Sequence, residues 1–165
     1  MAAAPTGGWL DESQQHIWRS YLLASTRLAE ELDQALAPFD LSLPEYELLV
    51  RLSEAPGNRA RMGDLASSVR HSRSRLTHTA KRMESKGLIR RESCVGDGRG
   101  VHAVLTDDGM ALLIEAAPAH VESVRRAFVD AISPEDFRAL GRAMCAVLRT
   151  ADERAGIPAG PQENG

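Results

Sequence analysis

The sequence lacks most features that mark a secreted or membrane protein. Among its 165 residues are only two cysteines, Cys94 and Cys145, too few and too isolated for a disulfide framework or a cysteine-based zinc site. There is no apolar run of about 18 residues, so no membrane span is expected. The first residues, MAAAPTGGWLDESQQH, lack the basic and apolar parts of a secretion signal. A cytoplasmic location is the simplest expectation.

Motifs for catalysis or cofactor binding are also missing. The chain has no P-loop, GxGxxG turn, HExxH helix or nucleophile elbow. The GDGRG segment is glycine-rich, but it leads into an expected strand rather than a helix, unlike a phosphate cradle. The five histidines form no i,i+4 pair and have no cysteine at zinc-finger spacing. We therefore expect no enzyme activity, no cofactor and no metal ion.

Charge is distributed unevenly along the chain. Residues 59–100 carry eleven Arg or Lys against four acids, whereas the rest carries nine bases and nineteen acids. A basic block within an acidic chain is typical of a nucleic-acid-binding module, although Arg-rich surfaces also occur without a partner. Aromatic residues make up only 4% of the chain, so the core must consist mainly of aliphatic side chains.

The spacing of apolar residues predicts a mainly helical chain. Steps of three and four between apolar positions indicate amphipathic helices, and two short β-branched runs that flank a glycine-rich segment indicate a hairpin. The helices are expected over 10–37, 44–54, 61–69, 72–86, 107–131 and 133–154, and the strands over 88–94 and 101–105.

Several residues predict where these helices begin and end. Ser42 and Glu45 form a capping-box pattern, and Thr106 is placed to cap the helix that follows it. Gly87 suits the left-handed position after a helix. Pro118 is expected to kink the helix that contains it.

Helix, turn, helix and hairpin follow one another in the order of a winged helix-turn-helix. We expect a mainly α fold with a small β-hairpin wing, flanked by long N- and C-terminal dimerisation helices. The expected divisions are a disordered tail (1–9), an N-terminal dimerisation helix (10–40), a winged helix-turn-helix DNA-binding lobe (41–106), C-terminal dimerisation helices (107–154) and a flexible tail (155–165).

The helix expected over 72–86 has an outward face suited to DNA. With Leu76, Ala80 and Met83 turned inward, the opposite face has short polar residues, a histidine and several bases, without the acids of an ordinary solvated helix. Such side chains can contact base edges and phosphates in a major groove. The expected DNA contacts are Arg61, Ser72, Arg73, Ser74, Arg75, Thr77, His78, Lys81, Arg82, Asp97 and Arg99.

The last two of these residues lie in the expected wing. Arg99, at a slim glycine-rich tip, can enter a narrow minor groove, where the negative potential is enhanced. Asp97 would then form an ion pair with an arginine and fix the orientation of that arginine side chain. The alternative is an ordinary hairpin turn in which Asp-Gly serves only the backbone.

The segment RMGDLASSVRHSRSRLTHTAKRMESKGLIRRESCVGDGRGVHAVLTDDGMALL (61–113) resembles the MarR family of bacterial transcriptional regulators. Its most specific parts are SRSRLT leading into RMESKGLIRR, and DGRG followed by a strand and LTDDG. The polar VRHSRSR turn departs from the more apolar turns often seen in the family. The resemblance implies a homodimer on a palindromic operator in double-stranded DNA, acting mostly as a repressor. The residues that it places at bases or nearby backbone are Ser72, Arg73, Ser74, Arg75 and His78, with Asp97 and Arg99 as the wing pair.

The resemblance also implies a small effector, often aromatic or phenolic, that releases DNA. Arg19, beside Trp18, and His16 are the candidate ligand residues; the alternative is an ion-paired Arg beside an interfacial Trp. Two other readings stay open. One is a redox-responsive regulator acting through Cys94 or Cys145, although buried structural thiols are the more ordinary explanation. The other is a winged-helix protein-interaction module that does not bind DNA.

Overall fold

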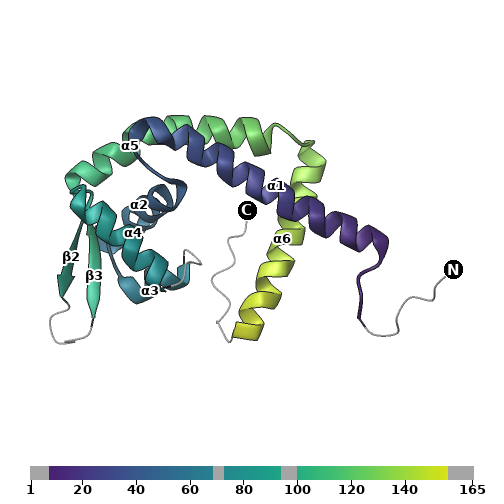
Figure 1. Cartoon of the computed structure of the whole chain (residues 1–165), viewed down its shortest axis with the longest axis horizontal. Coiled ribbons are helices and arrows are strands. Elements are labelled where there is room, and N and C mark those ends of the chain that lie inside the picture. The colour runs from purple at the N-terminus through teal and green to yellow at the C-terminus, as the bar shows by residue number, and fades with distance from the viewer. Residues whose placement is uncertain (1–7, 69–72, 94–99, 156–165) are drawn as a thin grey trace. The chain divides into compact units, whose positions relative to one another are not determined.

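The computed structural model describes residues 8–68, 73–93 and 100–155 (Figure 1). The chain divides into two units, one ending at Val124 and one beginning at Arg125, which are described separately. The helices of the first unit are α1 (Glu12–Leu36), α2 (Leu43–Glu54), α3 (Met62–Ser68), α4 (Arg73–Ser85) and α5 (Asp107–Val124), and its strands are β1 (Arg59–Arg61), β2 (Ile89–Ser93) and β3 (Val101–Leu105). The second unit contains α6 (Pro134–Ala155). A mainly α fold with a small sheet is therefore confirmed.

Capping interactions of nearby residues mark where several helices begin and end. Asp11 and Gln14 form a capping box at the start of α1, and Ser42 and Glu45 form the predicted one at the start of α2. At the end of α4, Gly87 has a φ of 74°, and the amide of Leu88 donates to the carbonyl of Met83 at 3.0 Å. This is the Schellman arrangement, which satisfies carbonyls left free at a helix end.

The helix expected over 107–131 differs from the structure in its second half. The α-helix continues through Pro118 and ends at Val124. A π-helical turn, Arg125–Val129, follows it. The expected α-helix was therefore too long at its C-terminal end, and the kink at Pro118 stays a prediction.

The sheet has one strand more than the predicted hairpin. Strands β2 and β3 pair antiparallel, with Ser93 opposite Val101, and β1 pairs antiparallel with the other edge of β3. The sequence prediction missed β1 because it is only three residues long and follows the EAPGN turn. Its central residue, Ala60, lies opposite Ala103 and packs against the core.

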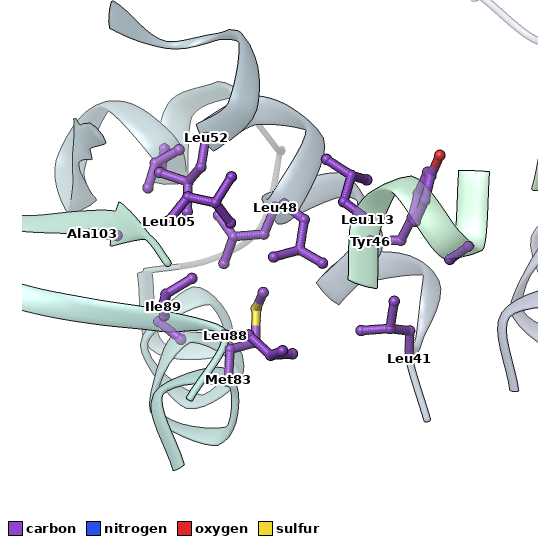
Figure 2. Packing of buried hydrophobic residues seen from close by; sticks show 14 of the residues in the cluster. Leu41, Tyr46, Leu48, Leu52, Met83, Leu88, Ile89, Ala103, Leu105 and Leu113 are labelled. Atoms are coloured by element: carbon purple, nitrogen blue, oxygen red, sulfur yellow. The ribbon is translucent and has the colours of Figure 1, made fainter. Parts of the chain in front are cut away.

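Apolar residues from α2, α4, the sheet and α5 form one core (Figure 2). Leu48, Leu49 and Leu52 of α2 are completely buried, and Leu76, Ala80 and Met83 supply the inner face of α4. The core residues labelled in Figure 2 are Leu41, Tyr46, Leu48, Leu52, Met83, Leu88, Ile89, Ala103, Leu105 and Leu113. With few aromatic rings available, interlocking aliphatic side chains fix the position of α4 against α2 and the sheet.

Thr106 and Gly109 bring the start of α5 into close contact with the segment between α4 and β2. A Cβ on Gly109 would lie 2.1 Å from the carbonyl oxygen of Leu88, so only glycine allows this approach. The hydroxyl of Thr106 lies 2.7 Å from the carbonyl oxygen of Gly87 and accepts the amide of Gly109 at 3.0 Å. Thr106 therefore caps α5, as predicted, and also ties it to the segment that follows α4.

Helix α1 runs alongside α5 (Figure 1), yet Leu36 is the one residue of α1 that is buried. Large apolar side chains along the helix, among them Ile17, Trp18, Tyr21 and Leu23, are exposed. In the second unit, Phe128 and Phe137 make an edge-to-face contact with ring centroids 5.6 Å apart, while Val147 and Leu148 of α6 are exposed. No helix in the described ranges is long and apolar enough to cross a membrane.

Candidate nucleic-acid interface

The outward face of α4 is polar and basic, as its helical wheel predicts. Ser74, Arg75, Thr77, His78 and Lys81 are all exposed. Among the described side chains of α4, none of the exposed ones is acidic. The face therefore offers hydrogen-bond donors and positive charge without a carboxylate that would repel phosphate.

Some of the predicted contacts cannot be placed. Ser72, Asp97 and Arg99 lie outside the described residues, and so does the side chain of Arg73, although its backbone begins α4. Arg61 is exposed on β1. The predicted roles of these residues on DNA stay predictions.

Arg82 has a different environment from its neighbours on α4. Its Nε donates to Oε1 of Glu45 at 2.8 Å, its Nη2 lies 2.6 Å from Oε2, and Nη2 also donates to the hydroxyl of Ser42 at 3.0 Å. Glu45 has no exposed surface. Sequence reasoning took Arg82 for a phosphate contact and missed this ion pair, because no local pattern links residues so far apart in the chain.

The charge on Glu45 is favoured by its partners. Burial acts to raise the pKa of Glu45, but hydrogen bonds from Arg82 and Ser42, with the nearby charge of Lys86, outweigh it and lower the pKa below its usual value. Glu45 is therefore a buried carboxylate that stays ionised. Lys86 also forms an ion pair with Asp40 at 3.0 Å, which links the end of α4 to the turn before α2.

A second ion pair joins α4 to the sheet. Glu84, the one acid in α4, accepts hydrogen bonds from the backbone amide of Arg91 at 3.1 Å and from its Nε at 2.8 Å. These hydrogen bonds, first of all that from the side chain of Arg91, lower the pKa of Glu84. Glu84 thus has a structural partner and lies off the exposed face of α4.

The strands place a further set of bases together, of which the sequence analysis had singled out only Arg61. Cross-strand register puts Arg59, Arg61 and Arg90 on the same face of the sheet as Glu92 and His102. Arg90 donates to Glu92 at 2.7 Å, and Nη2 of Arg59 lies 3.3 Å from Nδ1 of His102. The three arginines give this face a positive charge. The alternation of side chains along short strands could have shown it once β1 was recognised.

The candidate ligand residues lie near the start of α1. Arg19 lines a shallow hollow of about 210 Å³ together with Trp9, Leu10, Gln15 and Trp18. Its Nη2 donates to Oε1 of Gln15 at 3.2 Å. The lining combines two indole rings with a guanidinium, which suits an aromatic anion. His16 is exposed on the same helix but does not line the hollow.

A polar cluster between α2 and α5 escaped the sequence analysis. The rings of Tyr46 and His120 lie 4.3 Å apart, and burial lowers the pKa of His120 below its usual value of 6.5. Nδ1 of His120 and Oγ of Ser123 are buried, with no hydrogen-bond partner in the described part of the chain. Neither residue belongs to a periodic or motif signal that could have marked it.

The structure describes one of the two thiols. Cys145 is exposed on α6, so the expectation of a buried structural thiol is wrong for it, whereas Cys94 lies outside the described residues. The redox role stays a hypothesis. Over the ranges 8–68, 73–93 and 100–155, His, Cys, Asp and Glu side chains form no group of three or more that could hold a metal ion.

A helix-turn-helix with a basic exposed helix and an adjoining antiparallel sheet defines a winged-helix protein. The sequence profile of the MarR family matches residues 41–101. AbsC of Streptomyces coelicolor is 42% identical to this chain, with a TM-score of 0.82 over 89% of this chain and 99% of that one. Sco3205 of the same organism, whose structure is in complex with DNA, is 40% identical, with a TM-score of 0.83 over 89% and 92%. The chain belongs to the MarR family of transcriptional regulators.

Curated relatives agree with this assignment. The transcriptional regulator PecS of Dickeya dadantii (strain 3937) is 32% identical over 104 residues, which make up 62% of this chain and 60% of that protein. The match thus spans less than two thirds of PecS. These relatives are named as transcriptional regulators rather than enzymes, in agreement with the missing catalytic motifs.

Proposed function

We propose that this protein is a sequence-specific DNA-binding repressor that acts as a homodimer on a palindromic operator and is released by a small ligand. The observation that carries the proposal is the exposed face of α4, which bears Ser74, Arg75, Thr77, His78 and Lys81 without an acid. The buried inner face of α4 holds this surface outward. The crystal structure of Sco3205 in complex with DNA supports a nucleic-acid partner.

Each exposed residue type has a role that a major groove can use. Arg75 can bond bidentately to O6 and N7 of guanine, and Thr77 and Ser74 can reach base edges or phosphates. Lys81 can neutralise a phosphate as a point charge. A dimer bound over a promoter would exclude RNA polymerase, which makes repression the simplest outcome.

The dimer proposal rests on the exposed apolar side chains of α1. Ile17, Trp18 and Tyr21 lie on one side of a helix whose own unit leaves them uncovered, and contiguous apolar surface of this kind marks interaction sites. A two-fold dimer would place two α4 helices about 34 Å apart, one turn of DNA.

The ligand proposal rests on the hollow at Arg19. Trp9 and Trp18 offer apolar ring surfaces, and Arg19 offers a positive charge that can pair with a carboxylate or phenolate. A ligand that changes the spacing of the two lobes by binding one dimer conformation better would mismatch the half-sites. The coupling expected for such a switch is about 1–3 kcal/mol.

The first experiment is a binding titration of the purified protein with its own upstream DNA and with a scrambled duplex, at two salt concentrations. We expect preference for the upstream DNA and steep weakening with salt, because counterions are released from the phosphates. Arg75→Ala should cost about 1–3 kcal/mol of binding free energy. Arg27→Ala, which removes the same charge from α1, is the matched control and should leave affinity unchanged.

The alternatives give different results in this titration. Equal, weak binding to both duplexes would contradict sequence-specific recognition. A lack of DNA binding even at low salt would favour a protein-interaction module instead.

A further inference from the structure

Four residues connect α2 to the C-terminal half of α4, and we refer to them as the Glu45 cluster: Ser42, Glu45, Arg82 and Lys86. Both carboxylate oxygens of Glu45 are engaged by the guanidinium of Arg82, at 2.8 and 2.6 Å. The hydroxyl of Ser42 donates to Glu45 at 2.8 Å and accepts from Arg82 at 3.0 Å. Lys86 lies 3.7 Å from Glu45. The cluster therefore joins two helices through a closed set of polar contacts.

The burial of Glu45 makes this geometry restrictive. Its side chain has no exposed surface, whereas half of the Arg82 side chain is exposed. A buried carboxylate is tolerated only when its oxygens are paired and hydrogen-bonded. Because Glu45 lies in the first turn of α2 with its backbone fixed, its partner on α4 must occupy one position. A shift of α4 would leave a buried charge without its partner.

The cluster also continues into α1. The amide of Leu43, next to Ser42, donates to Oδ1 of Asp33 at 2.7 Å. Asp33 lies in the last turns of α1, and the 3-10 turn Ala37–Phe39 leads from α1 to the cluster. Polar contacts thus run from the end of α1 through the start of α2 to α4, all within the first unit.

Lys81 and Arg82 are adjacent bases with different surroundings. They are separated by about 100° around the helix, so Lys81 lies on the outward face while Arg82 reaches back to α2. If Arg82 bound a phosphate through its guanidinium, both oxygens of Glu45 would be left without their arginine partner. The two bases are therefore expected to have different tasks.

We propose that Glu45 and Arg82 are positioning residues: they fix α4 against α2, and Arg82 affects DNA recognition through the orientation of α4 rather than through a phosphate contact. The proposal rests on the DNA-binding function proposed for α4. It predicts that Glu45, a buried acid, is required for the preference of a basic helix for its operator.

Glu45→Gln distinguishes a positioning role of Arg82 from a phosphate contact, because the two roles predict opposite changes in DNA binding. If Arg82 positions α4, the weaker pairing with the neutral amide should lower the preference for upstream over scrambled DNA by about 5- to 150-fold, the range of typical couplings. If Arg82 is a phosphate contact, removing the acid frees it, and affinity should stay equal or rise. Equal or tighter binding by this variant would overturn the proposal.

Arg82→Lys provides the second measurement. It keeps the positive charge but removes the planar fork that pairs with both oxygens of Glu45. We expect a loss of preference similar to that of Glu45→Gln, with an unchanged slope of log affinity against log salt. Lys81→Gln is the matched control, in which the slope should decrease by about 0.9 for each phosphate that the lysine no longer neutralises. Near wild-type preference in Arg82→Lys would contradict the positioning role.

The experiment includes a readout that does not need DNA. Hydrogen–deuterium exchange in Glu45→Gln should speed up at the amides of α4, compared with those of α5, because α4 is less firmly held. If Glu45→Gln does not fold, Ser42→Ala takes its place. It removes two hydrogen bonds of the cluster but keeps the ion pair, so it should give a smaller increase in exchange. If the wild type shows no preference for its upstream DNA, the proposed function fails. Unchanged exchange at α4 in either folded variant would overturn the positioning role itself.

Discussion

The leucines of α2 and the apolar residues of α1 differ in how far their own unit covers them. Leu48, Leu49 and Leu52 are 0% exposed, whereas Ile17 and Tyr21 of α1 are 64% and 47% exposed. Both sets repeat at helical spacing, so periodicity alone does not separate them. The difference indicates that the winged lobe completes its core within one chain, while α1 carries apolar surface that suits a partner.

The largest expected effect is a loss of stability from a substitution in the core of the winged lobe. Leu48→Ala should lower the free energy of unfolding by about 2–5 kcal/mol, because it removes buried methyl groups and leaves a cavity. Chemical denaturation followed by circular dichroism measures this change. Ile17→Ala is the comparison variant on α1. A similar loss of unfolding free energy in isolated monomers of this variant would contradict the difference between the two helices.

The next effect concerns association rather than folding. Ile17→Glu places a charge on the apolar side of α1, so the proposed dimer should dissociate at concentrations at which the wild type stays associated. Burying an isoleucine is worth about 1.5–3 kcal/mol, and a buried unpaired carboxylate adds to the loss. Sedimentation velocity gives the oligomeric state, and circular dichroism should show an intact lobe. A wild-type sedimentation profile for this variant would argue against α1 as the interface.

Two helical glycines give opposite expectations in the two units. Gly109→Ala should destabilise the protein by about 1–3 kcal/mol, because its Cβ would meet the carbonyl of Leu88 and the structure would have to shift. Gly141→Ala in α6 has nothing within 4 Å of its Cβ and should stabilise the helix by up to about 1 kcal/mol. Thermal unfolding of both variants measures the difference. A loss of stability in Gly141→Ala would indicate that a second chain packs there.

The smallest expected effect is a dependence on pH from His120. Burial lowers its pKa below 6.5, so the unfolded chain binds a proton more readily than the folded one. The stabilising contribution is therefore complete above pH 6.5 and is lost as the pH falls through the folded pKa. His120→Phe keeps a ring beside Tyr46 and removes the titration. The difference in unfolding free energy between the two proteins, measured by denaturation between about pH 7 and 5.5, should change with pH; a constant difference would contradict the prediction.

The parts of the fold that depend on neighbouring residues could be predicted from the sequence. Helical periodicity located the helices, and capping chemistry identified Ser42, Gly87 and Thr106, because each signal involves residues within a turn of one another. The inner face of α4 followed from Leu76 by the same geometry. Interactions between residues close in the chain determine these helix positions and caps, so they can be predicted from a single sequence.

The features that were missed depend on contacts between distant segments. The carboxylate of Glu45 meets Arg82 only after α2 and α4 have packed, and β1 becomes a strand only because β3 offers a free edge. Gly109 was noted only as part of the LTDDG motif, and its packing role depends on the carbonyl of Leu88, which folding brings against it. The basic face of α4 was therefore predictable, while the role of Arg82 within it was not.

The contacts of Thr106 and Gly109 hold the start of α5 against the residues that precede β2, and this rigid junction is useful for protein engineering. Thr106 is bonded to the carbonyls of Gly87 and Leu88, and Ser93 lies opposite Val101 at the far end of the paired strands. Whatever joins Ser93 to Val101 is therefore attached to a support that does not depend on its length or sequence. Wings exchanged between relatives at these two residues should keep α4 in place, so that new DNA preferences can be built one segment at a time.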